Sequence, residues 1–211
     1  MNRPTTVVLI RHGECAGNVQ GLFRGARDFP LNACGKRQAK EVAEAATHLS
    51  IEHLYTSPLL RARETAQVIG DKIGLSPVEA HEITNVSLGS WEGRKKEEIA
   101  QESPELWEIW LNTPEKLQAP GIEPLTAVMQ RSRKKLDSLV KKHHGETIAL
   151  VSHRTVLKPL LSSCIGIQEP WFWRLHFDTA SISIMICKKG YYSLVALNRV
   201  EHLKNHETEW N

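Results

Sequence analysis

The chain has 211 residues, of which 41% are hydrophobic, 24% charged and 6% aromatic. These proportions exclude a disordered or fibrous protein, and a chain of this length buries enough apolar surface to fold without disulfides or a structural metal. Lysine and arginine total 27 against 24 for aspartate and glutamate, a formal net charge of +3, which is too small for a polyanion-binding protein. We therefore expect a single domain over 1–211 and no nucleic-acid partner.

Cysteine usage and hydropathy predict the compartment. The cysteines are scattered and form no Cys-x-x-Cys pair, which favours reduced thiols over a disulfide framework. The first apolar run, Val7 to Ile10, stops at Arg11 and is too short for a signal peptide or a membrane span. These features predict a cytoplasmic protein with no membrane partner.

Apolar patterning predicts strands and helices that alternate along the chain. Short β-branched runs predict buried strands, and apolar residues at helical spacing predict amphipathic helices. Ser57 and Pro58 are expected to cap one helix, and Pro159 is expected near the first turn of another. The expected strands cover 5–10, 51–56 and 147–151, the helices 34–49, 57–73, 124–144 and 156–165, and a hairpin 181–187 with 191–197.

The middle of the chain, 79–123, is less regular and is expected to be an insertion. It holds a short strand, a Gly-Ser-Trp-Glu-Gly turn and a short helix over 104–111, on which Trp107 and Trp110 are expected to pack. The fold class is therefore α/β. We expect a three-layer α/β/α sandwich with a mostly parallel central sheet flanked by helices, and a partly helical cap at 79–123 over the site.

Charged side chains follow several predicted strands. His12 and His153 each end a strand that leads to a helix, and ligands of open α/β sheets bind at the carboxyl ends of strands. Arg11 stands beside the first histidine, and Arg61 lies on the first turn of a helix that follows a third strand. Two guanidiniums, two imidazoles and helix N-termini suit a phosphate group. A single such histidine is more often structural, so the whole set carries the prediction.

Five other histidines do not follow a predicted strand beside an arginine, as His12 does. We expect His48, His53, His143, His144 and His206 to be solvated. Because His143 and His144 point in different directions on a helix, no metal site is expected there.

Several separated motifs resemble one known family, the histidine phosphatase superfamily, also called phosphoglycerate-mutase-like. The order and separation of these motifs make the resemblance specific, and it covers residues 5–203. The motifs are LIRHGE at 9–14, Asn18, DFPL at 28–31, SPLLRA at 57–62, LGSWEG at 88–93 and VSH at 151–153.

The resemblance implies a phosphomonoesterase that acts on a small phosphorylated metabolite without a metal or an organic cofactor. His12 would form a covalent phosphohistidine, and the positive charges beside it would keep its ring neutral. Arg11, Arg61 and His153 would hold the transferring phosphoryl group. Asn18 and the backbone near Gly25 would complete the pocket.

One departure from the family pattern concerns the proton donor. Most members have a glutamate four residues before the glycine matched by Gly89, and this chain has Asn85 there. Asparagine has no titratable proton, and a positioned general acid contributes about 10²–10⁴ in rate. We expect either that Glu82 bends into the pocket as the acid or that the enzyme favours substrates with good leaving groups.

Other departures lie at the mouth and leave alternatives open. Arg24 and Arg154 either favour a more anionic substrate or point to solvent.

A phosphoglycerate mutase is the second candidate for the function, although the residues 15–17 between the signature and Asn18 differ from those of the family's mutases. A catalytically weakened phosphate-binding or interaction protein is the third, because of Asn85. A homodimer is kept as one option for assembly.

Overall fold

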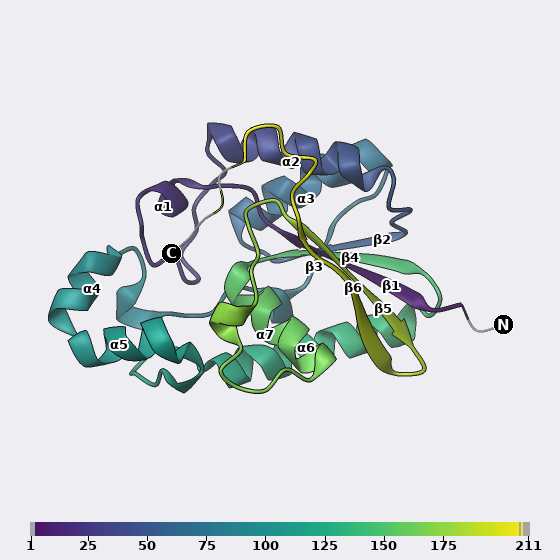
Figure 1. Cartoon of the computed structure of the whole chain (residues 1–211). Coiled ribbons are helices and arrows are strands. Elements are labelled where there is room, and N and C mark those ends of the chain that lie inside the picture. The colour runs from purple at the N-terminus through teal and green to yellow at the C-terminus, as the bar shows by residue number, and fades with distance from the viewer. Residues whose placement is uncertain (1–2, 207, 209–211) are drawn as a thin grey trace.

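The structure is a computed structural model that describes residues 3–206 and 208. Within these residues, the strands form one sheet in the order β3-β2-β4-β1-β5-β6. Strands β3, β2, β4 and β1 pair in parallel, whereas β5 pairs antiparallel with both β1 and β6 (Figure 1). The strands are β1 Thr5–Arg11, β2 His53–Thr56, β3 Val78–Glu79, β4 Thr147–Ser152, β5 Ile182–Lys188 and β6 Tyr191–Arg199.

Helices cover both faces of this mixed sheet. Helices α2 and α3 lie on one face, and α6 and α7 lie on the other (Figure 1). The helices are α1 Ala16–Val19, α2 Ala33–Ala46, α3 Leu60–Ile73, α4 Lys96–Glu102, α5 Pro104–Asn112, α6 Leu125–Lys142 and α7 Arg154–Ile165. The predicted α/β fold with a sheet between two helical layers is therefore confirmed.

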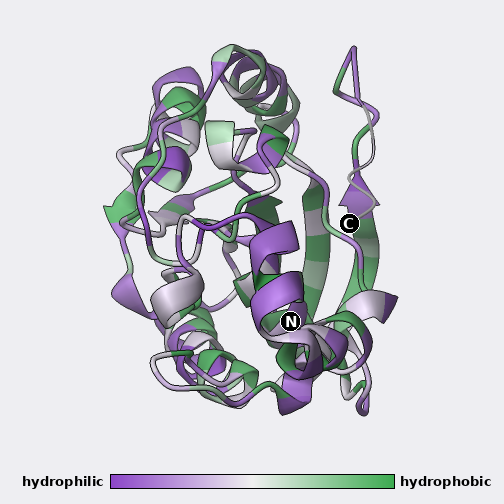
Figure 2. Cartoon of the chain, turned by 90° about the vertical axis from the view of Figure 1, so that its left-hand side faces the viewer, coloured by the Kyte–Doolittle hydropathy of each residue, from purple (hydrophilic) through white to green (hydrophobic). Residues whose placement is uncertain are grey.

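Strand β1 shows why the sheet is buried on both sides. Successive side chains of a strand point to opposite faces. Val8 and Ile10 pack with the side chains of α2 and α3, and Val7 and Leu9 pack in the larger core with α6 and α7. Figure 2 shows strands coloured as hydrophobic lying between helices that also carry hydrophilic residues. Among the described residues, no helix combines the length and the apolarity that crossing a bilayer requires.

The segment 79–123 extends beyond the carboxyl ends of the parallel strands. It holds the 3₁₀ helices η1 His81–Ile83, η2 Gly89–Trp91 and η3 Pro114–Lys116, in addition to α4 and α5. Helices α4 and α5 lie on the same side of the molecule as α1 (Figure 1). Phe23 packs on Trp91 and Trp110, with ring centroids 4.9 and 5.2 Å apart, so the predicted packing role of Trp110 holds. That the chain is a single domain with a cap stays a prediction.

Two helix starts differ from the sequence prediction. Helix α3 begins at Leu60, not at Ser57, because the carboxylate of Asp28 accepts the Leu60 N–H at 2.7 Å from a distant loop. Helix α7 begins at Arg154, two residues before the expected start, so Pro159 falls in its second turn rather than its first. Each helix is followed by a glycine in the left-handed conformation, Gly74 after α3 and Gly166 after α7, as the sequence predicts.

Candidate active site

Two buried imidazoles meet at the carboxyl edge of the sheet. His12 follows β1 directly, and His153 follows the neighbouring strand β4. Their ring centroids are 5.1 Å apart with the planes inclined by 56°. The structure therefore brings together the two histidines that the sequence predicted to share one crevice.

Hydrogen bonding fixes the tautomer of His12. Its Nδ1 lies 2.7 Å from the carbonyl oxygen of Gly13. Because a carbonyl only accepts, Nδ1 carries the proton and Nε2 keeps its lone pair. Burial, followed by the charges of Arg61, Arg11 and Arg24, holds the pKa of His12 well below its usual range. The ring is therefore neutral at neutral pH, with an unprotonated Nε2.

Arg11 and Arg61 are fully buried, and both donate hydrogen bonds to backbone carbonyls. Arg61 donates from Nη1 to the Arg27 carbonyl at 3.0 Å and from Nη2 to the Gly25 carbonyl at 3.1 Å. Arg11 donates from Nη1 to the Phe177 carbonyl at 2.7 Å. Burial lowers the pKa of Arg61 to about 10, which still leaves it protonated at neutral pH. Two buried cations beside neutral imidazoles favour an anionic ligand.

His153 has one ring nitrogen that the protein does not satisfy. Its Nε2 lies 2.7 Å from the hydroxyl of Ser57, which follows β2. Its Nδ1 is buried and makes no hydrogen bond to any described residue. Burial, with the charge of Arg61, holds the pKa of His153 well below its usual range. A buried nitrogen of this kind is suited to an oxygen atom of a ligand.

Asn85 braces the loop that carries Gly25. The Asn85 side-chain amide donates to the Gly25 carbonyl at 2.7 Å, and its oxygen accepts from the hydroxyl of Thr155. Gly25 has φ of +51°, and an added Cβ would lie 2.3 Å from Oε1 of Glu92. The same carboxylate oxygen accepts the N–H groups of Ala26 and Leu88, each at 2.9 Å. Asn85 is therefore a positioning residue for the carbonyl that holds Arg61.

A cavity of about 470 Å³, counted with the open solvent at its mouth, is lined by both histidines and by Arg11, whereas Arg61 lies behind its wall. Arginines 24 and 154, predicted at the mouth, line it, and Arg24 donates from Nη1 to the Gly17 carbonyl at 3.0 Å. Sequence reasoning missed Lys96 and Thr155 as lining residues. Thr155 lies two residues after His153, a spacing that could have indicated it. Other lining residues are Arg11, His12, Leu22, Phe23, Gly25, Asn85, Val86, Leu88, Trp110 and His153.

Two predicted residues lie elsewhere. Asn18 accepts from the N–H of Cys15 at 3.0 Å and from its thiol at 3.1 Å, so its oxygen caps α1. The Glu82 carboxylate is half exposed and pairs with Nζ of Lys135 on α6 at 3.4 Å. Arg131, also on α6, donates to the Glu82 carbonyl at 2.7 Å. The structure does not bring Glu82 to the cavity, because η1 turns its side chain toward α6.

The fold and this cavity define an α/β enzyme of the phosphoryl-transfer class, with imidazoles and guanidiniums gathered where parallel strands end. The chain belongs to the histidine phosphatase superfamily (branch 1), whose family model matches residues 7–200. The family predicted from the sequence motifs is therefore confirmed.

Named relatives extend this comparison. Phosphoserine phosphatase 1 of Hydrogenobacter thermophilus is 29% identical over 197 residues, which cover 93% of each chain. GpmB of Yersinia enterocolitica, named as a probable phosphoglycerate mutase, is 33% identical over 177 residues, covering 84% of this chain and 82% of that one. The solved structure of Bacillus stearothermophilus YhfR superimposes with a TM-score of 0.90 at 27% identity, over 95% of this chain and 100% of its own.

Proposed function

We propose that this protein is a phosphomonoesterase that hydrolyses a small phosphorylated metabolite through a covalent phosphohistidine on His12. The observation that carries the proposal is the hydrogen bond from Nδ1 of His12 to the Gly13 carbonyl at 2.7 Å. It leaves the Nε2 lone pair for attack, beside the buried guanidiniums of Arg61 and Arg11 whose charges act on the ring. Family membership and the phosphatase relative support the same reaction class.

In the proposed reaction, Nε2 of His12 attacks phosphorus and the ester P–O bond breaks. Arg11, Arg61 and Nδ1 of His153 stabilise the equatorial oxygens as charge develops on them. The departing oxygen takes a proton from water. A second water then attacks the phosphohistidine, the N–P bond breaks, and inorganic phosphate leaves with His12 neutral again.

The nature of the leaving group follows from the residues at the cavity wall. The Asn85 amide does not ionise and so cannot act as a general acid, and the Glu82 carboxylate pairs with Lys135 outside the cavity. Of the two options that the sequence left open, this arrangement supports a preference for good leaving groups. Such groups depart with little protonation, so the missing general acid costs them least.

The charge of the substrate follows from the mouth of the cavity. Arg24, Lys96 and Arg154 line it in addition to the buried Arg11. Such a concentration of cationic side chains favours a phosphomonoester with a second anionic group. The relatives named above are named for phosphoserine and phosphoglycerate, which both carry a carboxylate. We propose that the segment 79–123, which supplies Asn85 and Trp110 to this wall, acts as the cap.

The experiment is a phosphate-release screen over phosphorylated metabolites, with His12→Ala as the blank. Brief incubation with ³²P-labelled substrate, followed by quenching, should trap phosphate on His12 in the wild type and not in the variant. Transfer of phosphate between the two hydroxyls of glycerate, without release, would instead identify a mutase. If no substrate gives phosphate release or a trapped phosphohistidine, the result would favour a phosphate-binding protein without activity.

Two further properties belong to the proposal. The four cysteines are free, which supports the cytoplasmic location expected from the sequence.

Edge strand β6 exposes Tyr191 and Val195, which are 80% and 57% accessible. This exposure supports pairing of two copies along this edge as a homodimer. Light scattering of wild type and Val195→Lys measures the assembly, and a wild-type monomer would contradict the dimer.

A further inference from the structure

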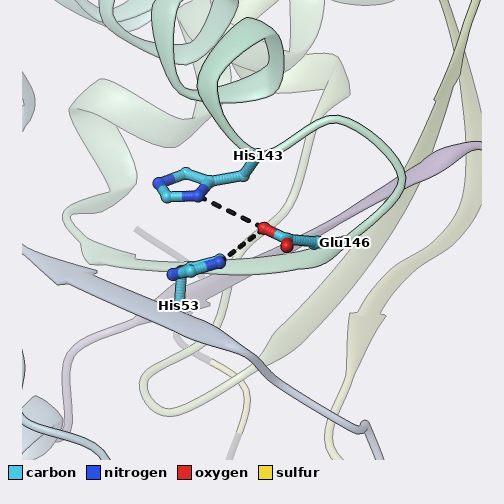
Figure 3. Close-up of side chains that lie close together, drawn as sticks. All are labelled: His53, His143 and Glu146. Atoms are coloured by element: carbon cyan, nitrogen blue, oxygen red, sulfur yellow. Dashed lines mark hydrogen bonds and ion pairs between the residues drawn. The ribbon is translucent and has the colours of Figure 1, made fainter.

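Three side chains able to bind a metal lie close together away from the cavity: His53, His143 and Glu146 (Figure 3). His53 begins β2, His143 follows the last turn of α6, and Glu146 immediately precedes β4. His12 and His153 follow the carboxyl ends of β1 and β4, whereas this cluster lies at the amino ends of the parallel strands. The cluster is therefore separate from the phosphoryl-transfer site.

The geometry of the three ligand atoms is compact. Nε2 of His53 lies 2.6 Å from Oε2 of Glu146, and Nδ1 of His143 lies 3.3 Å from the same oxygen. The two imidazoles stack with centroids 3.6 Å apart and planes inclined by 26°. Zinc binds imidazole nitrogen at about 2.0–2.1 Å and carboxylate oxygen at about 2.0–2.2 Å, so its ligand atoms lie roughly 3.5 Å from one another. Because the lone pairs of stacked rings lie in the ring planes, the carboxylate must move outward and the two rings must turn before one ion can bind all three groups.

A second group orients one of the rings. The hydroxyl of Tyr55 lies 2.8 Å from Nε2 of His143. Metal-bound histidines usually donate their other N–H to a carboxylate, a backbone carbonyl or water, which fixes the tautomer and the ring direction, and the Tyr55 hydroxyl occupies that position here. A tyrosine hydroxyl both donates and accepts, so this bond is compatible with Nδ1 as the metal ligand.

The backbone holds the cluster, and solvent reaches it. The Glu146 carbonyl accepts the Thr6 N–H at 3.0 Å, and the Glu146 N–H donates to the His143 carbonyl at 3.1 Å. The side chains of His53 and Glu146 are 31% and 42% exposed, whereas that of His143 is 8% exposed. The expectation that His143 is solvated is therefore wrong, because the end of α6 folds back onto β2. The exposed side leaves access for an ion and for a water ligand.

We propose that His53, His143 and Glu146 bind one divalent transition-metal ion of the zinc class. Two imidazoles and one carboxylate suit Zn²⁺ and its first-row neighbours, whereas Mg²⁺ and Ca²⁺ prefer oxygen ligands throughout. With three protein ligands, a water takes the remaining position of a tetrahedral ion. The bound ion joins β2 to the α6–β4 connection and so stabilises the folded chain.

The experiment titrates Zn²⁺ into the chelator-treated full chain against a chromophoric chelator, and records the visible absorption of Co²⁺ as a measure of coordination. We expect one Zn²⁺ per chain in the wild type. His53→Ala and Glu146→Gln should weaken binding at least tenfold, and Tyr55→Phe should weaken it by about 10- to 100-fold. His144→Ala is the matched control, because His144 is an exposed histidine next to the cluster.

A second readout guards against misfolded variants. Zn²⁺ should raise the melting temperature of wild type and His144→Ala but not that of His53→Ala, whose circular dichroism and phosphate release should match the wild type. The proposal is overturned if Zn²⁺ binds wild type and His53→Ala equally, which would assign binding to another histidine pair such as His12 and His153. The absence of stoichiometric binding to the wild type would overturn it as well.

Discussion

Nε2 of His153 lies 2.7 Å from the hydroxyl oxygen of Ser57, so the end of β2 orients a ring that follows β4. The same hydroxyl accepts the N–H of Leu59 at 3.3 Å, which ties the bend before α3 to the site. Ser57 is fully buried, and water cannot replace it without rearrangement. Ser57 therefore orients His153, and in the proposed reaction it would act on the substrate only through that ring.

Removal of the Ser57 hydroxyl should slow the reaction. Ser57→Ala leaves a buried imidazole nitrogen unsatisfied, a cost of about 1–3 kcal/mol. Because roughly 1.4 kcal/mol is a tenfold change in rate, we expect kcat/KM to fall about 10- to 100-fold. Ser57→Thr, which keeps a hydroxyl, should recover part of the loss, and the exposed Ser90→Ala serves as the unaffected control. Wild-type kinetics in Ser57→Ala would contradict the positioning role.

A methyl group at Gly25 should damage the arginine clamp. Gly25→Ala puts a non-glycine residue at φ +51° with its Cβ 2.3 Å from Oε1 of Glu92, which displaces the carboxylate that holds Ala26 and Leu88. The left-handed conformation alone costs about 1–2 kcal/mol. We expect a lower melting temperature and, because the Gly25 carbonyl moves away from Arg61, a higher KM.

Gly21→Ala is the matched control for this change. Gly21 has φ of +64°, but nothing lies within 4 Å of an added Cβ. It should therefore show the backbone cost in the melting temperature without the rise in KM. Equal KM values for the two variants would mean that the loop does not position Arg61.

Protonation of the buried histidines should destabilise the protein in acid. The pKa values of His12 and His153 lie well below 6.5 in the folded chain, chiefly because both rings are buried. Between these values and 6.5 the unfolded chain binds more protons, so stability falls as pH drops below 6.5. Each histidine contributes a slope of up to about 1.4 kcal/mol per pH unit. Urea unfolding of wild type and His12→Asn from pH 8 to 5 measures how the unfolding free energy changes with pH.

The variant should lose less stability in acid than the wild type, since an asparagine does not titrate. His48→Asn is the comparison, because His48 is exposed on the surface. Its unfolding free energy should follow the wild-type pH dependence. A His12→Asn curve parallel to that of the wild type would exclude His12 as a source of the slope.

Much of the site could be predicted from the sequence because its positions follow directly from local patterning. The run of Val7 to Ile10 predicts a buried strand, and the residue after a parallel strand must lie at the ligand edge, which places His12. The same reasoning places His153 after β4. Tertiary contacts decide the rest.

Those contacts come from distant segments, so no local pattern reports them. Asp28 moves the start of α3 past Ser57 and leaves its hydroxyl to His153. Lys135 and Arg131 of α6 draw Glu82 away from the cavity. The burial of His143 depends on how the end of α6 meets β2, which the spacing of two adjacent histidines does not reveal.

A buried lysine outside the cavity should reduce the stability of the fold. Nζ of Lys158 lies 4.3 Å from the centre of the Phe172 ring and 4.7 Å from that of the Trp173 ring. Burial lowers the pKa of Lys158 to about 6, although such rings favour a cation by about 2 kcal/mol when it is desolvated. The unfolded chain keeps the proton up to about pH 10.4, so stability is lost as pH falls from there toward 6.

Lys158→Met removes this titration while keeping the volume. We expect the variant to be more stable than the wild type by about 1–4 kcal/mol at pH 7, with a smaller difference at pH 10. Denaturant unfolding at the two pH values measures the change, and Lys134→Met, an exposed lysine of α6, is the control. A destabilised Lys158→Met would show that the aromatic rings more than offset the burial of the amine.

The missing general acid should appear as a steep dependence on the leaving group. Wild type should hydrolyse aryl phosphates much faster than alkyl phosphates, and Glu82→Gln should change neither, because the Glu82 carboxylate pairs with Lys135 away from the cavity. Asn85→Glu places a carboxyl group beside the Gly25 carbonyl in a buried position, where burial raises its pKa and the cations of the cavity lower it.

The protonated fraction of this carboxyl can act as the acid, so the change should accelerate alkyl esters, by at most about 10²–10⁴, and aryl esters little. Asn85→Gln is the matched control, because it has the same length as glutamate and no titratable proton. Rates for a series of phosphates of graded leaving-group pKa measure the slope in each variant. Alkyl esters cleaved as fast as aryl esters by the wild type would contradict the leaving-group preference. A large loss of their cleavage in Glu82→Gln would instead return Glu82 to the role of acid, since only its proton would then account for the rate.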